Sequence, residues 1–209
     1  MGAKELDRKS HWESVYSSKS AQETSWYQLE PRLSLDLIEK TGIDKGQAII
    51  DVGGGASVLV DFLLKLGYSD LTVMDISAAA LQQARQRLDQ KASAVDWIEA
   101  DATEFVPRKT FELWHDRAAF HFLTEKEDRV RYLHALNRSL KSGGWVIMAA
   151  FAPDGPEKCS GLHIVQYDAA KMAKALGEMY RLERQKNEMH VTPAGHQQSF
   201  GFYCFRKMA

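Results

Sequence analysis

The chain has 209 residues, of which 44% are hydrophobic and 26% charged, a balance typical of a folded globular protein. Its length suits one compact domain and leaves too little chain for two ordinary ones. A formal net charge of −1, without a long run of Lys or Arg, gives no electrostatic reason to expect a nucleic-acid partner.

Apolar residues recur with the spacing of alternating strands and helices. Five short, buried strands are expected at residues 48–52, 71–74, 95–98, 111–115 and 145–151. Helices are expected at residues 33–41, 58–66, 77–88 and 125–140, and Ser77 is a suitable cap for the third of these. Ser142-Gly143-Gly144 is expected to form a turn before the fifth strand.

The last forty residues follow a different pattern. A helix at residues 168–179 precedes two strands, at 180–191 and 199–206, which have only Pro193-Ala194-Gly195 as a turn between them. Without a helix between them, these strands pair antiparallel at one edge of the sheet. The sequence thus predicts an α/β, doubly wound, mostly parallel seven-stranded sheet with an antiparallel C-terminal edge hairpin.

The first strand ends in Asp51 and runs into the turn Gly53-Gly54-Gly55. In such sheets ligands bind beyond the carboxyl ends of the strands, and glycines allow a ligand to approach the backbone. Asp75 ends the second strand, where its carboxylate suits two ribose hydroxyls. A dinucleotide fingerprint starting at Gly53 fails at Val58, and the phosphate-binding loop of nucleoside triphosphatases is absent.

Four segments, in order, resemble motifs of the class I S-adenosylmethionine-dependent methyltransferases. They are Ile49-Ile50-Asp51-Val52-Gly53-Gly54-Gly55, Val73-Met74-Asp75-Ile76-Ser77, Glu99-Ala100-Asp101-Ala102 and Leu140-Lys141-Ser142-Gly143-Gly144. The resemblance covers roughly residues 45–151. It implies S-adenosylmethionine as the methyl donor and S-adenosylhomocysteine as its product.

The resemblance also implies a role for each donor-binding residue. Gly53 and Gly55 line the methionyl part of the donor, while Asp51 orients the loop or binds the amino group. Ser57 stands where the family commonly has a third glycine, so a donor contact there is left open.

The same resemblance assigns the nucleoside half of the donor. Asp75 holds the ribose, and Ile76 packs against the adenine. Asp101 accepts from the adenine amino group, and the backbone N–H of Ala102 reaches a ring nitrogen.

The loop after the fourth strand faces the transferring methyl in related enzymes. Asp116 and His121 are the acid–base candidates there, and Asp116 is also a candidate donor contact. Arg117 binds an anionic acceptor or pins Asp116. In the alternative interpretation, these residues only brace the loop.

Trp12, Tyr16, Trp26 and Tyr27 form an aromatic cluster before the core. It resembles the N-terminal lid of some small methyltransferases, particularly bacterial proteins related to the lysine methyltransferases of citrate synthase and elongation factor 1A. We therefore expect one methyltransferase domain at residues 1–209, with a helical lid at 1–44 and a core at 45–209. The aromatic rings attract the sulfonium by cation–π contact, or else they only fasten the segment to the sheet.

Missing motifs narrow the choice of acceptor. No Asn-Pro-Pro-Tyr stretch follows the fourth strand and no Pro-Cys pair occurs, which argues against nucleic-acid bases as acceptors. The seven histidines show no compact metal-ligand spacing, so no metal is expected. The loop at 152–162 is suited to select the substrate; its Cys159 has no activating neighbour in sequence, and Cys204 fits a packing role.

Methyl transfer to a small polar molecule is the expected function. The alternatives are a protein-lysine methyltransferase and a catalytically silent, donor-binding regulatory protein. The longest apolar runs are too short to cross a bilayer, no export signal is present, and two cysteines fit a reducing compartment. These features predict a cytoplasmic protein with a small-molecule or protein acceptor and no membrane partner; they leave the oligomeric state open.

Overall fold

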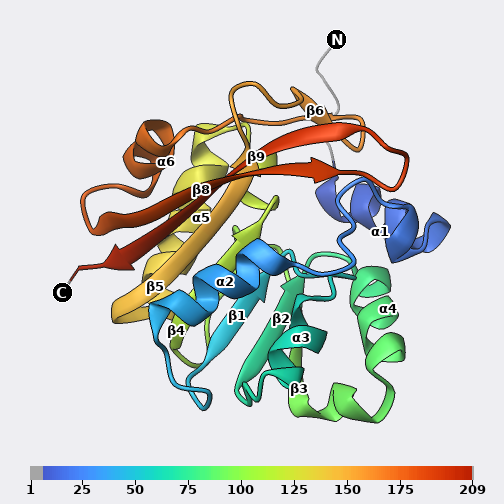
Figure 1. The fold of residues 1–209 in the computed structure, drawn as a ribbon, viewed down its shortest axis with the longest axis horizontal. Helices are drawn as coiled ribbons and strands as arrows, with labels where there is room; N and C mark the ends of the chain where they lie inside the picture. The colour runs from blue at the N-terminus through green and yellow to red at the C-terminus, as the bar shows by residue number, and fades with distance from the viewer. Residues whose placement is uncertain (1–6, 209) are drawn as a thin grey trace.

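The computed structural model describes residues 7–208 and contains a seven-stranded sheet. The strand order is β3-β2-β1-β4-β5-β9-β8, which places β1 and β4 at the centre (Figure 1). The strands are β1 (Ile49–Val52), β2 (Leu71–Asp75), β3 (Val95–Glu99), β4 (Phe111–Arg117), β5 (Leu140–Phe151), β8 (Tyr180–Val191) and β9 (Gln197–Lys207). The first five run parallel, and β8 and β9 are antiparallel. The predicted fold class is confirmed.

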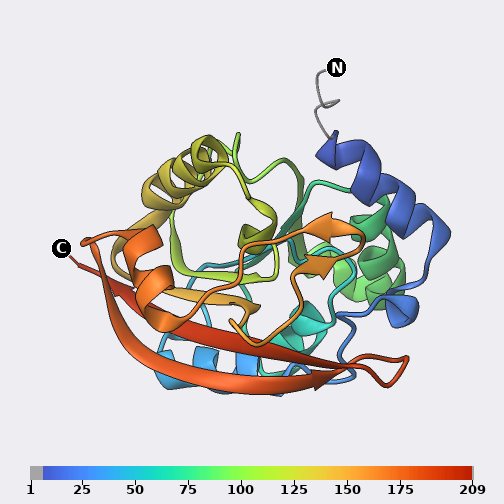
Figure 2. The same cartoon turned by 90° about the horizontal axis from the view of Figure 1, so that it is seen from above.

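Helices cover both faces of the sheet, as Figure 2 shows from above. The helices are α2 (Arg32–Thr41), α3 (Leu59–Lys65), α4 (Ala78–Leu88), α5 (Lys126–Ser139) and α6 (Ala169–Leu176). Apolar residues of α2, α3 and α4 share one core cluster, and those of α5 and α6 share the other. Alternate residues of each central strand point into the two clusters, because successive side chains in a strand face opposite sides. The helices that the structure describes include none that is long and apolar enough to span a membrane.

The chain opens with α1 (Arg8–Ser18) and a 3₁₀ turn at Ala21–Glu23, both beyond the carboxyl edge of the parallel strands (Figure 1). A small hairpin of β6 (Lys158–Cys159) and β7 (Leu162–His163), which the sequence analysis did not predict, lies over the same edge. Short 3₁₀ turns at Asp89–Ala94 and Phe120–Phe122 complete the elements.

Two predicted boundaries differ from the structure. The turn expected at 142–144 lies inside β5, where pairing passes directly from Phe111–Leu140 to Leu113–Trp145 and residues 141–144 bulge out. Gly143 has φ of +71°, which glycine adopts without strain. Helix α2, expected within the lid, instead packs with fully buried Leu37 and Ile38 in the core.

Candidate active site

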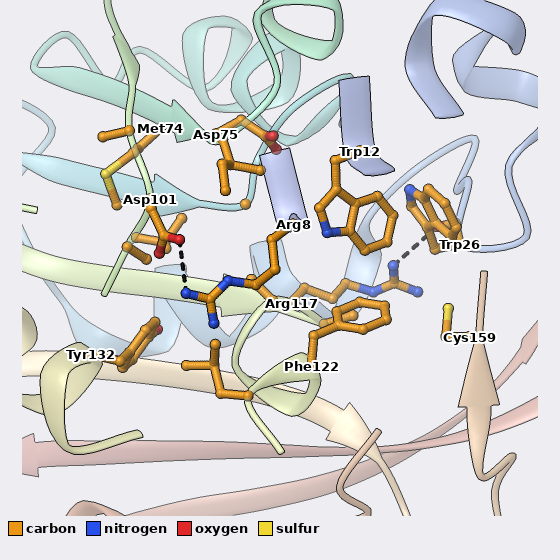
Figure 3. Close-up of a pocket in the computed structure, with 18 of the residues that line it drawn as sticks. Arg8, Trp12, Trp26, Met74, Asp75, Asp101, Arg117, Phe122, Tyr132 and Cys159 are labelled. Atoms are coloured by element: carbon orange, nitrogen blue, oxygen red, sulfur yellow. Dashed lines mark hydrogen bonds and ion pairs between the residues drawn. The ribbon is translucent and has the colours of Figure 1, made fainter. Parts of the chain in front are cut away.

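A cavity opens at the carboxyl ends of β1, β2 and β4 (Figure 3). Helix α1, the segment carrying Trp26 and the β6–β7 hairpin contribute to its walls. Its lining residues include Arg8, Trp12, Tyr16, Trp26, Gly53, Asp75, Ile76, Asp101, Ala102, Arg117, Phe122, Tyr132, Cys159 and Phe200. Nine of the predicted site residues are in this wall, and they come from the first three motifs, the end of β4 and the N-terminal aromatic cluster; no residue of the fourth motif lines it.

The glycine turn after β1 is shaped by close contacts that no other residue allows. Gly53 has φ of +67° and Gly55 of +35°, both in the left-handed region. A Cβ on Gly53 would come within 2.6 Å of the Ala119 Cβ, and one on Gly55 within 2.6 Å of an Asp75 carboxylate oxygen. Gly53 lines the cavity, whereas Gly55 packs beneath Asp75; the predicted contacts of both with the methionyl group stay predictions.

Asp75 is the buried carboxylate of the cavity, only 6% exposed. Its Oδ1 accepts a hydrogen bond from the Ser77 N–H at 2.9 Å. Burial raises the pKa of Asp75 to about 7, and the negative charges of Asp51 and Glu13 act in the same direction. A ligand that donates hydrogen bonds to this carboxylate relieves its desolvation, as a ribose diol would.

A chain of buried, hydrogen-bonded side chains fixes the position of Asp51. Its Oδ1 lies 2.7 Å from Nδ1 of His115, and the other ring nitrogen of His115 lies 2.9 Å from the Ser34 hydroxyl. This chain ties β1 to β4 and α2. Asp51 lines a second cavity, on the α2 side of the glycine turn, together with Gly53 and Gly54. It is thus placed to orient the loop or to meet the amino end of a donor.

Ser57, at the family's third glycine position, has a local structural role. Its hydroxyl accepts a hydrogen bond from Leu59 N–H at the start of α3. Arg87 donates to the carbonyls of Ala56 and Ser57 and pairs with Asp61, which anchors the end of the glycine turn to α4.

The other end of the cavity carries Ile76, Asp101 and Ala102. Both Asp101 oxygens are already in use: Oδ1 accepts from the N–H and hydroxyl of Thr103, and Oδ2 pairs with Arg8 at 3.0 Å. Arg8 also pairs with Asp128 at 2.6 Å. An adenine amino group must therefore share Asp101 with Arg8 or displace it, a contact that the sequence analysis did not foresee.

Asp116 is not in the wall of the cavity, contrary to its predicted roles as a base and a donor contact. Its side chain is fully buried and accepts hydrogen bonds from the N–H groups of Ala119 and Phe120 and from the Tyr132 hydroxyl at 2.5 Å. Trp114 in turn donates to the Tyr132 oxygen at 2.8 Å. Asp116 thus holds the turn after β4, which agrees with the alternative interpretation.

His121 is also absent from the wall, although it too was predicted to be catalytic. It is fully buried against Phe122 and Phe151. Burial and the charge of Arg117 lower the pKa of His121 to about 3. Such an imidazole does not retain a proton at neutral pH, so this geometry does not support an acid–base role. Arg117 does not contact Asp116, which removes the option that it pins that carboxylate.

Three of the four predicted aromatic lid residues surround the cavity: Trp12, Tyr16 and Trp26. Trp12 lies edge-on to Phe122 with ring centroids 4.8 Å apart, and Trp26 donates through Nε1 to the Tyr16 hydroxyl. Tyr27, the fourth, instead lines the second cavity near Asp51.

Polar contacts fasten the lid helix α1 to the core. Glu13 accepts from the Ser77 hydroxyl at 2.7 Å and from Ala79 N–H, at the start of α4. Gln83 donates to the carbonyls of Tyr16 and Lys19. Sequence reasoning missed Glu13 and Gln83 because each pairs across more than sixty residues, with no local pattern to reveal it.

Cys159 lines the cavity, and burial raises the pKa of its thiol to about 11. It is therefore a thiol and not a thiolate at neutral pH, which makes it a poor nucleophile. Within residues 7–208, no group of three or more His, Cys, Asp or Glu side chains is arranged to hold a metal ion.

Residues 49–144 match the family model described as "Methyltransferase domain". The mouse (Mus musculus) eEF1A lysine and N-terminal methyltransferase is 24% identical over 157 residues, covering 72% of this chain and 22% of that protein. UbiE of Ruegeria sp. (strain TM1040), a ubiquinone/menaquinone biosynthesis C-methyltransferase, is 29% identical over 126 residues, covering 56% of this chain and 49% of that protein. The chain therefore spans about half or less of the length of these relatives.

Solved structures share the fold over nearly the whole chain. A SAM-dependent methyltransferase from Anabaena variabilis superposes with a TM-score of 0.76 at 12% identity, covering 99% of this chain and 98% of that one. The N-methyltransferase NodS from Bradyrhizobium japonicum WM9, solved with S-adenosyl-L-homocysteine, gives 0.71 at 15% identity, covering 93% and 97%. Residues 49–144 of the chain are thus similar to a methyltransferase domain, and the chain shares its fold with solved S-adenosylmethionine-dependent methyltransferases.

Proposed function

We propose that the protein transfers a methyl group from S-adenosylmethionine to a small polar molecule. The cavity beside the glycine turn carries this proposal. Its walls combine the buried carboxylate of Asp75 with a lid of Trp12 and Trp26, and its far end meets Arg117. In this proposal residues 8–28 act as the lid, and the rest of the described chain, including α2, is the core of one domain.

The residues present fit the donor. All of these residues line the cavity, and in this proposal Asp75 accepts from the ribose hydroxyls, Ile76 and Ala102 contact the adenine, and the Gly53 turn lines the methionyl group. When bound, the donor supplies an electrophilic methyl on a positively charged sulfur. The aromatic rings of the lid favour that charge and keep water from the reacting atoms.

Methyl transfer forms a bond between the acceptor atom and the methyl carbon while the carbon–sulfur bond breaks. The electron pair of that bond stays on sulfur, and the acceptor's proton, if it has one, leaves to solvent or to a nearby group. Because Asp116 and His121 lie outside the cavity wall, the chain contributes chiefly by holding the two reactants in line. The proposed acceptor is therefore one that reacts without a strong protein base.

A second candidate, methylation of a lysine in a protein, is favoured by one surface feature. A wide groove continues from the cavity between α1, the start of α5 and the β6–β7 hairpin. Its carboxylates are Asp7, Glu99, Asp101, Glu104, Glu125 and Asp128, against the cations Arg8, Lys9 and Arg131. An excess of negative charge suits a basic peptide, and the mouse relative is named for a lysine acceptor.

Radiolabelled S-adenosylmethionine, incubated with the protein and cell extract split by size, tests these proposals. Label in the metabolite fraction is expected, and label confined to the protein fraction would favour lysine. Donor binding with no transfer to either fraction would indicate a silent regulatory protein. Gly55→Ala, which strains the turn beneath Asp75, should abolish transfer. The matched control Gly46→Ala adds a Cβ in open space and should preserve it.

A further inference from the structure

Arg117, at the end of β4, has an unusual pattern of hydrogen bonds. Its side chain is only 11% exposed, and Nη1 donates to the Trp26 carbonyl at 3.0 Å. Nε and Nη2 are shielded from solvent and have no hydrogen-bond partner among the described residues. These two nitrogens form one edge of the guanidinium, the edge that fits both oxygens of a carboxylate.

Arg117 has a carboxylate nearby that does not accept a hydrogen bond from it. Burial lowers the pKa of Arg117 to about 10, so the guanidinium remains protonated at neutral pH. Glu188 is the nearest carboxylate, with an oxygen 3.9 Å from Nη2, beyond hydrogen-bond distance. Glu188 accepts instead from Gln28 at 3.1 Å. A buried cation whose donors are unused is costly unless a ligand supplies the missing acceptors.

We propose that Arg117 binds a carboxylate of the methyl acceptor through its Nε and Nη2 edge. This proposal rests on the proposed methyl transfer, because it assigns a substrate class to the same cavity. Because both nitrogens are shielded from solvent, the proposal requires the lid segment that carries Trp26 to move before a carboxylate reaches them.

The surroundings of Arg117 favour the acceptor over the donor as the source of the carboxylate. The guanidinium lies 4.6 Å from the Phe200 ring of β9, and its charge acts on Cys159 of β6. In the proposed function Asp75 and Asp101 bind the ribose and adenine of the donor. Asp75 ends β2 and Asp101 follows β3, and both strands lie on the side of β4 opposite to β9. Figure 3 shows Arg117 reaching toward Trp26 and Cys159 and away from Asp101.

Apolar walls define the rest of the acceptor. Phe122, Trp26 and Phe200 line the cavity near Arg117. A carboxylate on a small aromatic or aliphatic body satisfies both the cation and these rings.

The test measures binding of benzoate, phenylacetate and hexanoate, each beside its primary amide, to protein saturated with S-adenosylhomocysteine. Calorimetry should show binding of at least one carboxylate and about tenfold weaker binding, or none, of its amide. Arg117→Gln should lose about tenfold or more in affinity for that carboxylate, and Arg117→Lys should recover only part of it. Arg181→Gln, an exposed cation at the β8 edge, is the matched control and should leave binding unchanged.

Measurements of donor binding distinguish a failure of the Arg117 proposal from a failure of the proposed function. If Arg117→Gln weakens S-adenosylhomocysteine but not methylthioadenosine, which lacks the amino-acid group, Arg117 serves the donor's carboxylate and the proposal is overturned. Equal binding of carboxylates and amides, or no binding of either to the loaded protein, also overturns it and leaves the proposed function standing. Failure of the wild-type protein to bind S-adenosylhomocysteine at all would instead count against the proposed function.

Discussion

Replacing Asp75 with alanine should weaken donor binding more than any single change in the loop after β4. Its carboxylate is 6% exposed and lines the cavity, with one oxygen held by Ser77 N–H. Losing an acceptor for the ribose hydroxyls should cost roughly 1.5–3 kcal/mol, the range for hydrogen bonds to charged groups. This corresponds to a loss of about 10- to 150-fold in affinity.

The pH dependence of donor binding provides a second test of Asp75. Because its pKa is raised from 3.8 to about 7, the carboxyl is mostly protonated at pH 5.5 in the free protein. Donor binding should then be about 30-fold weaker at pH 5.5 than at pH 8.5, since ionisation must precede the ribose contact. The raised pKa also makes the stability of the free protein depend on pH. As the pH rises from 3.8 to about 7, Asp75 loses its proton in the unfolded state but keeps it in the folded state, so the free energy of unfolding falls.

Calorimetric titration of S-adenosylhomocysteine into the wild type, Asp75→Ala and Asp75→Asn, at several pH values, measures both effects. The asparagine variant keeps the shape of the side chain but cannot titrate, so its affinity should not follow the wild-type slope. Wild-type affinity in a folded Asp75→Ala variant would show that the ribose lies elsewhere.

Four further changes address other parts of the site. Gly55→Ala should weaken S-adenosylhomocysteine binding by about tenfold or more in calorimetry, because its Cβ would meet the Asp75 carboxylate, while Gly46→Ala should bind as the wild type does. Asp116→Asn should lower the free energy of unfolding by about 1–3 kcal/mol in urea melts, because it weakens a buried hydrogen bond with Tyr132. His121→Gln should keep the single-turnover rate of the wild type. A large loss of rate in a stable His121→Gln variant would restore the catalytic role of His121. Arg8→Ala should speed donor dissociation in stopped-flow fluorescence by releasing α1 from Asp101 and Asp128, and an unchanged rate would show that these ion pairs do not hold the lid.

The fold could be predicted from sequence because the central parallel strands β1, β2 and β4 are largely buried on both faces and appear as short apolar runs. The turn after β1 and Asp75 were also predictable, since glycines and a strand-ending carboxylate have a local signature. The bulge at 141–144 was not predictable, because Ser142-Gly143-Gly144 suits a turn equally well.

The structure does not support the acid–base assignments, for a physical reason that sequence does not reveal. Asp116 lies near the carboxyl end of β4, but its oxygens accept hydrogen bonds from the N–H groups of Ala119 and Phe120 and from the Tyr132 hydroxyl. Arg8 was missed because its partner Asp101 is 93 residues away. Such contacts depend on how α1 folds over the sheet, which no local pattern encodes.

Parallel titrations with S-adenosylmethionine, S-adenosylhomocysteine and NAD⁺ test the central claim most directly. We expect both sulfur compounds to bind with micromolar or tighter affinity, and the dinucleotide not to bind at the same concentrations. Binding of NAD⁺ with neither sulfur compound bound would contradict the assignment of this cavity to a methyl donor.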